Sequence, residues 1–380
     1  MDDRELHAHL IGQQGSRAAL NTPVLVLDLD ALDRNIAAMQ AKVARAGVAL
    51  RPHAKTHKSV EIARRQIAAG AVGVCCAKIG EAEVLVEGGA TGVLITSPVA
   101  APGAIARLAA LAERVEGLMA TVDDPAVTRR IDAALADTGA TLAVVIDIDP
   151  GIRRTGVASA EAAVDLARVI GECPRLRLMG VQFYCGSQQH IAEFAARRDA
   201  IAERTDYLAS VIAALSEAGH APEIVTGSGT GTHAIDLALG VFTELQAGSY
   251  VFMDAQYLDC DLDGGGAPPF ETALMVDSRV VSANHAALAT IDAGFKSLST
   301  DGGTARVADG APRDATFAFM GDEHGALIGP GIGTRLRPGD AVTLIVPHCD
   351  PTVNLYDNYH VVQDGTLVDI WPVSARGRAR

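Results

Sequence analysis

Aromatic side chains are scarce in this sequence, and it has neither a long apolar run nor an excess of basic residues. Phe, Trp and Tyr make up 4% of the 380 residues although 49% are hydrophobic, so the cores must be built mainly from aliphatic side chains. No apolar run approaches the roughly 18 residues of a membrane-spanning helix. The net charge of −14 argues against nucleic acid or an anionic membrane as a partner, because both require a basic face.

The cysteines and the first residues of the chain indicate its compartment. The six cysteines are scattered without a CxxC pair, and Cys75 and Cys76 lie in an apolar run typical of a buried strand. The opening MDDRELHAHL contains acidic residues and no apolar core, so it does not resemble a secretory signal. We therefore expect a protein of the reducing cytoplasm.

Short apolar runs alternate with longer amphipathic segments from about residue 30 to residue 250. Alternation of this kind is typical of βαβ units and a parallel sheet. Eight such units favour a (β/α)8 TIM-like barrel over a doubly wound open sheet, which is the competing architecture. The strand-like runs span residues 48–53, 72–77, 92–96, 116–122, 142–148, 177–184, 222–227 and 242–248.

The character of the chain changes after about residue 265, where strands and turns follow one another without a convincing helix. This pattern predicts a C-terminal antiparallel β domain at residues 265–376, after a barrel at residues 22–255. Turn-forming residues at 254–269 predict the connection between the two domains. The N-terminal residues 1–30 end in an apolar strand that is a candidate to pack on the β domain.

The segment RPHAKTHK, residues 51–58, places two lysines and two histidines directly after the first predicted strand. Chemistry in a barrel lies at the C-terminal ends of the strands, so a lysine here faces the barrel mouth. Partial desolvation and neighbouring cations favour the neutral amine that Schiff-base chemistry needs. For an isolated lysine, an exposed basic turn is the alternative.

Two glycine-rich turns follow the last two predicted strands, TGSGTGTH at 226–233 and QAGSY at 246–250. A pair of turns in these positions commonly holds a phosphate group on backbone N–H groups. A lysine after the first strand and a phosphate site after the last two together indicate pyridoxal 5'-phosphate (PLP).

A third motif, PHCDPTVNLYD at 347–357, contains His348 and Asp350 two residues apart. On an extended strand these two side chains share a face, and Cys349 points the opposite way. One imidazole and one carboxylate, with water at the remaining positions, suit Mg, Mn or a similar divalent ion. For a lone HxD pair, a purely structural role is the alternative.

Together these motifs resemble the metal-activated D-threonine aldolase group of the fold-type III PLP enzymes. Its relatives are the 3-hydroxy-D-aspartate aldolases and the D-serine dehydratases. The resemblance covers about residues 21–376 and includes VCCAKIGEAE, the RTG of DPGIRRTGV, GSQQH, DAGFKS and DEHG. It implies an alanine-racemase-like PLP barrel with a C-terminal β domain. It also implies a homodimer with shared active sites and a small D-β-hydroxy amino acid as the substrate.

The resemblance assigns a role to each matching position. Lys55 is implied as the Schiff-base lysine, with Lys58 as a supporting cation. Arg154 would reach the phenolic oxygen of the cofactor, Tyr184 would lie near its pyridine ring, and His190 would act as a base. The implied phosphate contacts are Gly229, Thr230, Gly248, Ser249 and Tyr250, and the implied metal ligands are His348 and Asp350.

The implied reaction is retro-aldol cleavage of a D-β-hydroxy-α-amino acid to glycine and an aldehyde. Its alternative is β-elimination by a D-serine or D-3-hydroxyaspartate dehydratase to a keto acid and ammonia. Dehydratases tend to have HxC where this chain has HCD, so Asp350 favours the aldolase. A non-catalytic PLP carrier resembles the barrel half alone. Aldolases of the group usually differ from this chain at four positions expected to shape the substrate pocket, namely Ala77, Ser97, Pro98 and Cys185.

Overall fold

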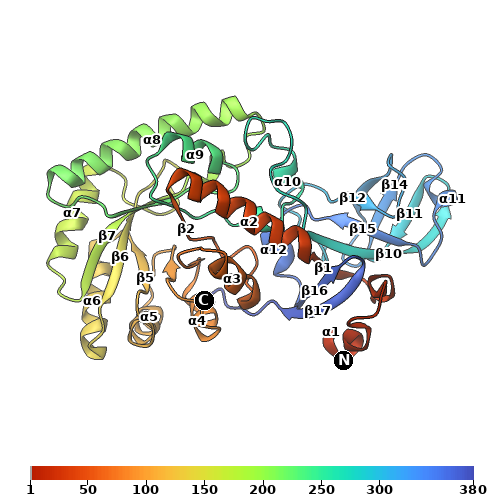
Figure 1. Ribbon diagram of the computed structural model, residues 1–380, viewed down its shortest axis with the longest axis horizontal. Helices are drawn as coiled ribbons and strands as arrows, with labels where there is room; N and C mark the ends of the chain where they lie inside the picture. Colours follow the sequence, from red (N-terminus) through yellow and green to blue (C-terminus); the bar gives the residue numbers. More distant parts are fainter. Residues whose placement is uncertain (1) are drawn as a thin grey trace. The chain divides into compact units, whose positions relative to one another are not determined.

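The computed structural model describes residues 2–380, which divide into two compact units (Figure 1). The barrel unit comprises residues 37–248, 260–269 and 377–380. The β unit comprises the described residues up to 36 together with residues 249–259 and 270–376. The predicted domain boundaries at 255 and 265 lie in a segment whose parts are divided between the two units.

Eight parallel strands form the sheet of the barrel unit, in the order β2-β9-β8-β7-β6-β5-β4-β3. The two ends of this order also meet, because the segment after β2 pairs with β3. The Cys75 N–H donates to the Pro52 carbonyl at 2.9 Å, and the Ala54 N–H donates to the Cys75 carbonyl at 2.8 Å. The predicted TIM-like barrel is confirmed. Its strands are β2 (Ala49–Leu50), β3 (Cys75–Cys76), β4 (Leu94–Ile95), β5 (Met119–Val122), β6 (Leu142–Asp147), β7 (Leu176–Phe183), β8 (Ile224–Gly227) and β9 (Glu244–Leu245).

Helices connect these strands, and local capping fixes where several of them begin. The side chains of Ser59, Asp124 and Ser159 each accept a backbone N–H of the first helical turn. Helix α7 buries Ala163, Leu166, Ala167 and Ile170 at the spacing of one helical face. The helices are α2 (Leu29–Ala46), α3 (Val60–Ala68), α4 (Ile79–Glu87), α5 (Pro102–Arg114), α6 (Pro125–Thr138), α7 (Ala160–Gly171), α8 (Phe194–Glu217) and α9 (His233–Leu239).

The β unit contains a nine-stranded, mostly antiparallel sheet whose main path is β13-β14-β11-β10-β1-β16-β17. The N-terminal strand β1 pairs antiparallel with β10 and parallel with β16, so it lies inside this sheet. The strands are β1 (Val24–Asp28), β10 (Leu274–His285), β11 (Leu288–Ile291), β12 (Arg306–Asp309), β13 (Thr316–Phe319), β14 (Gly325–Ile328), β15 (Ala341–Ile345), β16 (Asn358–Gln363) and β17 (Thr366–Pro372).

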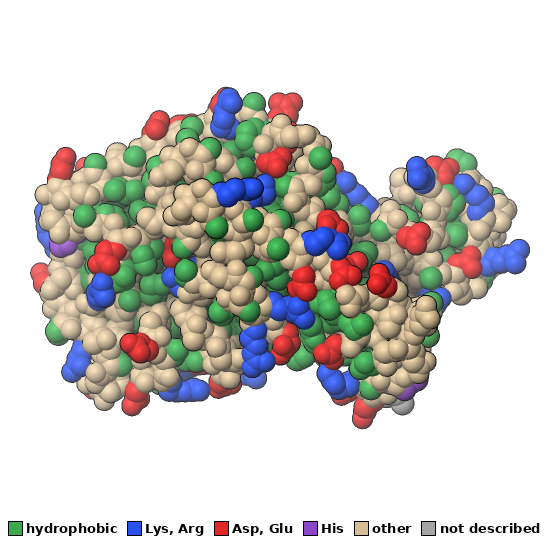
Figure 2. Space-filling model, viewed as in Figure 1, with side chains coloured by type: hydrophobic (Ala, Val, Ile, Leu, Met, Phe, Trp, Pro, Cys, Tyr) green, Lys and Arg blue, Asp and Glu red, His purple; other side chains and the backbone are tan. Residues whose placement is uncertain are grey.

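Acidic and basic side chains are interspersed over the face of the molecule shown in Figure 2. Within residues 2–380, no helix has both the length and the apolar character needed to cross a membrane.

Candidate active site

Lys55 lies in the turn directly after β2, at the C-terminal end of that barrel strand, and it is half-buried. Its backbone N–H donates to Nδ1 of His53 at 3.3 Å, so the Nε2 atom of His53 carries the ring proton. That Nε2 atom donates to the Thr96 hydroxyl at 3.0 Å, and the hydroxyl in turn donates to the Cys76 carbonyl at 3.1 Å. His53 therefore supports the turn that presents Lys55.

His57 and Lys58 of RPHAKTHK also have structural partners. Nδ1 of His57 accepts the Ser59 N–H at 3.1 Å, and its Nε2 lies 3.2 Å from Oε1 of Gln66. Nζ of Lys58 lies 3.3 Å from Oε1 of Glu81, and these side chains are only 11% and 5% exposed. The cation predicted at Lys58 is thus part of a buried ion pair.

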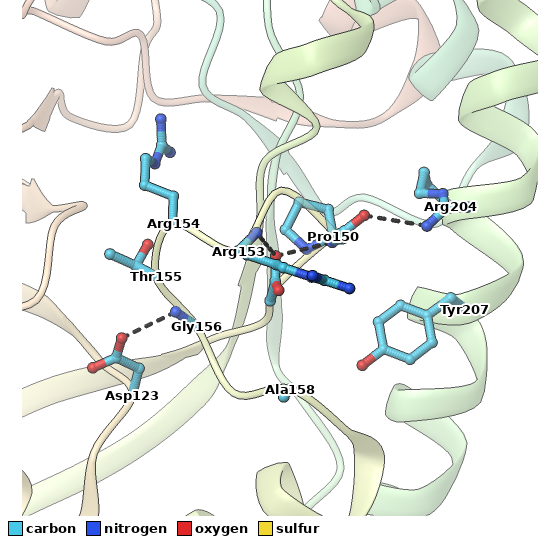
Figure 3. Close-up of a pocket in the computed structure, with 11 residues that line it drawn as sticks. Asp123, Pro150, Arg153, Arg154, Thr155, Gly156, Ala158, Arg204 and Tyr207 are labelled. Carbon is cyan, nitrogen blue, oxygen red and sulfur yellow. Dashed lines mark hydrogen bonds between the residues drawn. The ribbon is translucent and has the colours of Figure 1, made fainter.

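Arg154 follows β6 in the RTG loop, residues 149–157, and its guanidinium lies 5.7 Å from the ring centroid of Tyr184. Tyr184 comes directly after β7, so two neighbouring strands bring together two predicted cofactor contacts. The preceding Arg153 has the left-handed φ of 55°. The two arginine side chains therefore point in different directions. In Figure 3, Arg153 extends toward Tyr207 of α8 and Arg154 extends away from it.

A pocket of about 760 Å³ lies beside the RTG loop (Figure 3). Arg153, Arg154, Arg204 and Tyr207 contribute to its lining, but Lys55 does not. The pocket is therefore adjacent to the Arg154 loop and is distinct from the predicted Schiff-base position.

The glycine-rich turn after β8 has no room for side chains at its closest approaches. A Cβ atom at Gly229 or Gly231 would collide with Gln189, and Ser228 between them and the strand has a φ of 69°. Thr230 is buried in the same turn. Such a turn presents backbone rather than side chains, as a phosphate site requires.

Gly248, in the second glycine-rich turn, lies against the lysine segment. A Cβ atom there would be 2.7 Å from the Thr56 hydroxyl oxygen and 2.9 Å from the His53 carbonyl. The Thr56 hydroxyl is buried and has no hydrogen-bond partner among residues 2–380. A buried hydroxyl of this kind calls for a polar ligand, so the residues of the barrel unit fit a phosphorylated cofactor. Ser249 and Tyr250 continue the chain as the 3-10 helix Ser249–Val251 of the β unit, and both are buried.

His190 is exposed in the turn between the 3-10 helix Gly186–Gln188 and α8. Cys185 is buried before that turn, and burial raises the pKa of its thiol to about 12. It is therefore a neutral, weakly polar group at neutral pH.

The extended strand expected around His348 and Asp350 is wrong in detail. Strand β15 ends at Ile345, and Cys349 begins a five-residue helix, α12 (Cys349–Val353), with His348 as its N-cap residue. Asp350 therefore lies in the first turn of a helix, and the alternation of a strand does not apply. Cys349 itself is fully buried.

Two carboxylates that the sequence did not predict contact the segment His348–Asp350. Oδ2 of Asp301 lies 2.8 Å from Nδ1 of His348, which favours the tautomer with its lone pair on Nε2. Asp254 is buried and accepts the Cys349 N–H at 3.0 Å, which anchors the start of α12. Burial raises the pKa of Asp254, and hydrogen bonds from the Cys349 and Tyr257 N–H groups oppose the shift. An imidazole oriented by a carboxylate, with Asp350 two residues further along the chain, supplies donor types that fit a divalent metal.

Asp3, His7 and His360 form another close group, with ligand atoms within 4.8 Å of one another. Nε2 of His7 accepts the Asn21 N–H at 3.0 Å, so its Nδ1 carries a proton and donates to Nε2 of His360 at 2.8 Å. The lone pair that a metal would need on Nδ1 is absent in this tautomer. We therefore interpret the group as a buried hydrogen-bonded histidine pair.

Comparison with known proteins agrees with this geometry. Residues 27–256 match the family described as alanine racemase, N-terminal domain, and residues 273–362 match the one described as putative serine dehydratase domain. A D-threonine aldolase from Arthrobacter sp. is 40% identical over 370 residues, which cover 96% of this chain and 94% of that protein. The chain belongs to the D-threonine aldolase family. Like the members named here as aldolases, it is a lyase.

Two solved structures place this member of the D-threonine aldolase family among its relatives. A D-threonine aldolase from Filomicrobium marinum is 40% identical, with a TM-score of 0.91 over 95% of this chain and 97% of that one. A D-threo-3-hydroxyaspartate dehydratase from Delftia sp. HT23 is 29% identical, with a TM-score of 0.83 over 94% of this chain and 98% of that one. The alanine-racemase-like fold is therefore shared by aldolases and dehydratases.

Proposed function

We propose that this protein is a PLP- and divalent-metal-dependent aldolase that cleaves D-β-hydroxy-α-amino acids to glycine and an aldehyde. The observation that carries the proposal is the half-buried Lys55 at the end of β2, in a chain 40% identical over 96% of its length to a D-threonine aldolase. The glycine turns and the nearby Thr56 hydroxyl, which lacks a hydrogen-bond partner, support PLP. His348, oriented by Asp301, supports the metal.

The residues of the barrel unit divide the work of holding PLP. Lys55 would bind the cofactor covalently, and the turns at Gly229, Thr230 and Gly248 would receive its phosphate. Arg154 and Tyr184, which contact each other, orient its ring. When bound, PLP supplies an electron sink for the bond cleaved at Cα.

His348, Asp350 and His190 are the residues proposed to remove the proton of the β-hydroxyl group. His348 and Asp350 would hold the ion, and Asp301 occupies Nδ1 of His348 so that the lone pair of Nε2 would be available to it. A divalent metal supplies Lewis acidity toward a hydroxyl oxygen. His190 takes the hydroxyl proton as a general base. We further propose a homodimer in which the β unit of one subunit completes the active site of the other.

Dehydration of D-serine or D-3-hydroxyaspartate is the second candidate, because the Delftia dehydratase shares the fold over 94% of this chain. In that reaction a base removes the Cα proton and the β-hydroxyl leaves. Asp350 favours the aldolase, because the resemblance places a cysteine at this position in dehydratases. A cysteine thiolate would favour softer ions such as zinc, whereas a carboxylate suits Mg or Mn.

Product identification distinguishes the candidates. The PLP-loaded protein is incubated with D-threonine and with D-serine, with added Mn²⁺ or with EDTA. Glycine and an aldehyde that form only with metal support the proposal. A keto acid and ammonia would identify a dehydratase, and the absence of any product in all four incubations would indicate a PLP carrier.

A further inference from the structure

Asp147 is a buried carboxylate at the end of β6 that none of the assigned roles uses. Its Oδ1 atom accepts the side-chain amide of Gln182 at 2.9 Å, and its Oδ2 atom accepts the Thr155 hydroxyl at 2.7 Å. Thr155 is the residue after Arg154, so one carboxylate oxygen points to the barrel interior and the other to the RTG loop.

Three contacts fasten the RTG loop at its base. Besides the Thr155 bond, the Val157 N–H donates to the Asp147 carbonyl at 2.8 Å, and the Gly156 N–H donates to Oδ2 of Asp123 at 3.0 Å. Gly156 has a φ of 100°, and a Cβ atom there would lie 2.5 Å from the Asp149 nitrogen. The chain on the C-terminal side of Arg154 therefore has little freedom while these contacts persist.

The barrel interior fixes the position of Asp147 through a buried amide network. The Gln182 amide also donates to the Thr96 carbonyl at 2.9 Å, so its NH₂ group bridges that carbonyl and Asp147. Gln246 donates to Oε1 of Gln182 at 3.2 Å and to the Thr226 hydroxyl at 3.0 Å. The network links β6, β7, β8 and the segments after β4 and β9, and it orients the donor face of Gln182 toward Asp147.

We propose that Asp147, in its ionised form, is a positioning residue for Arg154, because it anchors Thr155 of the RTG loop to the buried Gln182–Gln246 network. The inference rests on the proposed PLP site, since Arg154 is its predicted contact with the cofactor. Protonation of Asp147 at Oδ2 forces the Thr155 hydroxyl to turn from donor to acceptor. It also removes the negative charge that attracts the Arg154 guanidinium.

The surroundings of Asp147 allow its protonation near neutral pH. Burial raises the pKa of Asp147 to about 6, with Asp123 adding to the shift, whereas the bonds from Gln182 and Thr155 and the charge of Arg154 oppose it. Asp123 follows β5 and Arg154 lies in the loop, while the groups facing Asp147 from β7 are neutral amide and backbone atoms.

The test compares Asp147→Asn with Thr155→Val and Thr155→Ser. Asparagine keeps the shape and accepts from Gln182, but its amide donates toward Thr155 and it does not titrate. Valine removes the hydroxyl of Thr155 alone, and serine restores it. PLP affinity is measured by equilibrium dialysis from pH 5 to pH 8.5, with the absorption maximum of the bound cofactor recorded as a second readout.

At pH 8 we expect Asp147→Asn and Thr155→Val each to weaken PLP binding about tenfold, the size of one charge-assisted hydrogen bond, and Thr155→Ser to bind like the wild type. The double variant should lose no more than either single one, because both changes remove the same charge-assisted hydrogen bond from Thr155 to Asp147. At pH 5 the wild type and Asp147→Asn should converge. Melting temperatures check that each variant folds.

The outcomes separate this inference from the proposed function. A wild type that binds PLP, with Asp147→Asn and Thr155→Val indistinguishable from it at pH 8, overturns the positioning role alone. Fully additive losses in the double variant overturn the link through Thr155. A wild type that takes up no PLP overturns the proposed function and this inference together. If Asp147→Asn does not fold, the comparison of Thr155→Val with Thr155→Ser still decides.

Discussion

Nδ1 of His348 lies 2.8 Å from Oδ2 of Asp301, a residue 47 positions earlier in the chain. The contact fixes which imidazole nitrogen is available to the proposed metal, and it would make Asp301 a supporting residue of the site although it is not one of the proposed ligands. Carboxylates that orient a ligating histidine are worth roughly 10–100-fold in metal affinity.

We therefore predict that Asp301→Ala weakens Mn²⁺ binding by about 10–100-fold while the protein stays folded. Glu323→Gln is the matched control, because it removes one acidic charge from an exposed ion pair with Lys296 in the same unit. Titration calorimetry with Mn²⁺ measures both variants. Equal affinities for Asp301→Ala and Glu323→Gln would show that the His348–Asp301 contact does not tune the metal site.

The two lysines of RPHAKTHK should respond to substitution in opposite ways. Lys55→Ala should abolish covalent attachment of PLP and leave the stability nearly unchanged, because it removes a half-buried amine at a strand end. Lys58→Ala should cost about 3–5 kcal/mol, because it leaves Glu81 charged and buried without its partner. Borohydride trapping with peptide mapping and urea unfolding provide the two measurements. Recovery of the trapped cofactor on Lys58 contradicts the assignment of Lys55.

Asp147 should lower the stability of the protein at neutral pH. Its folded pKa of about 6 exceeds the ordinary value of 3.8, so between these pH values the folded state binds more protons than the unfolded state and stability falls as the pH rises. Asp147→Asn should therefore be more stable than the wild type at pH 8, by up to about 2–3 kcal/mol, with the difference vanishing near pH 4. Denaturant unfolding at both pH values checks this. A destabilised Asp147→Asn at pH 8 would indicate a purely structural carboxylate.

The histidine pair in the β unit should have the opposite pH dependence. Burial lowers the pKa of His360 to about 4, although Asp3 opposes the shift. The unfolded chain takes up a proton near pH 6.5 and the folded one near pH 4, so the stability that neutral His360 provides is lost as the pH falls through this window. His360→Gln cannot titrate and should lose less stability than the wild type between pH 7 and pH 4. Parallel pH dependences of the two proteins would contradict this assignment.

Much of the barrel could be predicted from the sequence because its strands are buried on both sides and read as short apolar runs. Seven of the eight strands lie within the predicted runs, and β7 begins one residue before its run. Lys55 and the glycine turns follow the strands where the barrel places its chemistry. Periodicity failed at His348, where α12 begins directly after an extended N-cap residue. No local pattern announces such a five-residue helix.

The supporting carboxylates were beyond sequence reasoning for a different reason. Asp301 and Asp254 lie 47 and 95 positions from the residues they hold, and Asp301 occurs in a polar, turn-rich stretch that resembles an ordinary loop. Asp147 lies in the apolar run LAVVIDI, but its partners Thr155 and Gln182 become visible only when the loop and β7 are placed beside β6. Long-range pairing of polar side chains needs the tertiary structure.

The most direct test of the proposed function is the metal dependence of glycine formation from D-threonine. The PLP-loaded protein is freed of metal with EDTA, and glycine and acetaldehyde are quantified before and after Mn²⁺ is restored, with Asp350→Ala in parallel. We predict equal amounts of glycine and acetaldehyde in the restored wild type, and almost none in the chelated wild type or in Asp350→Ala. Full turnover of the thoroughly chelated wild type, or a keto acid with ammonia in place of glycine, would contradict a metal-dependent aldolase.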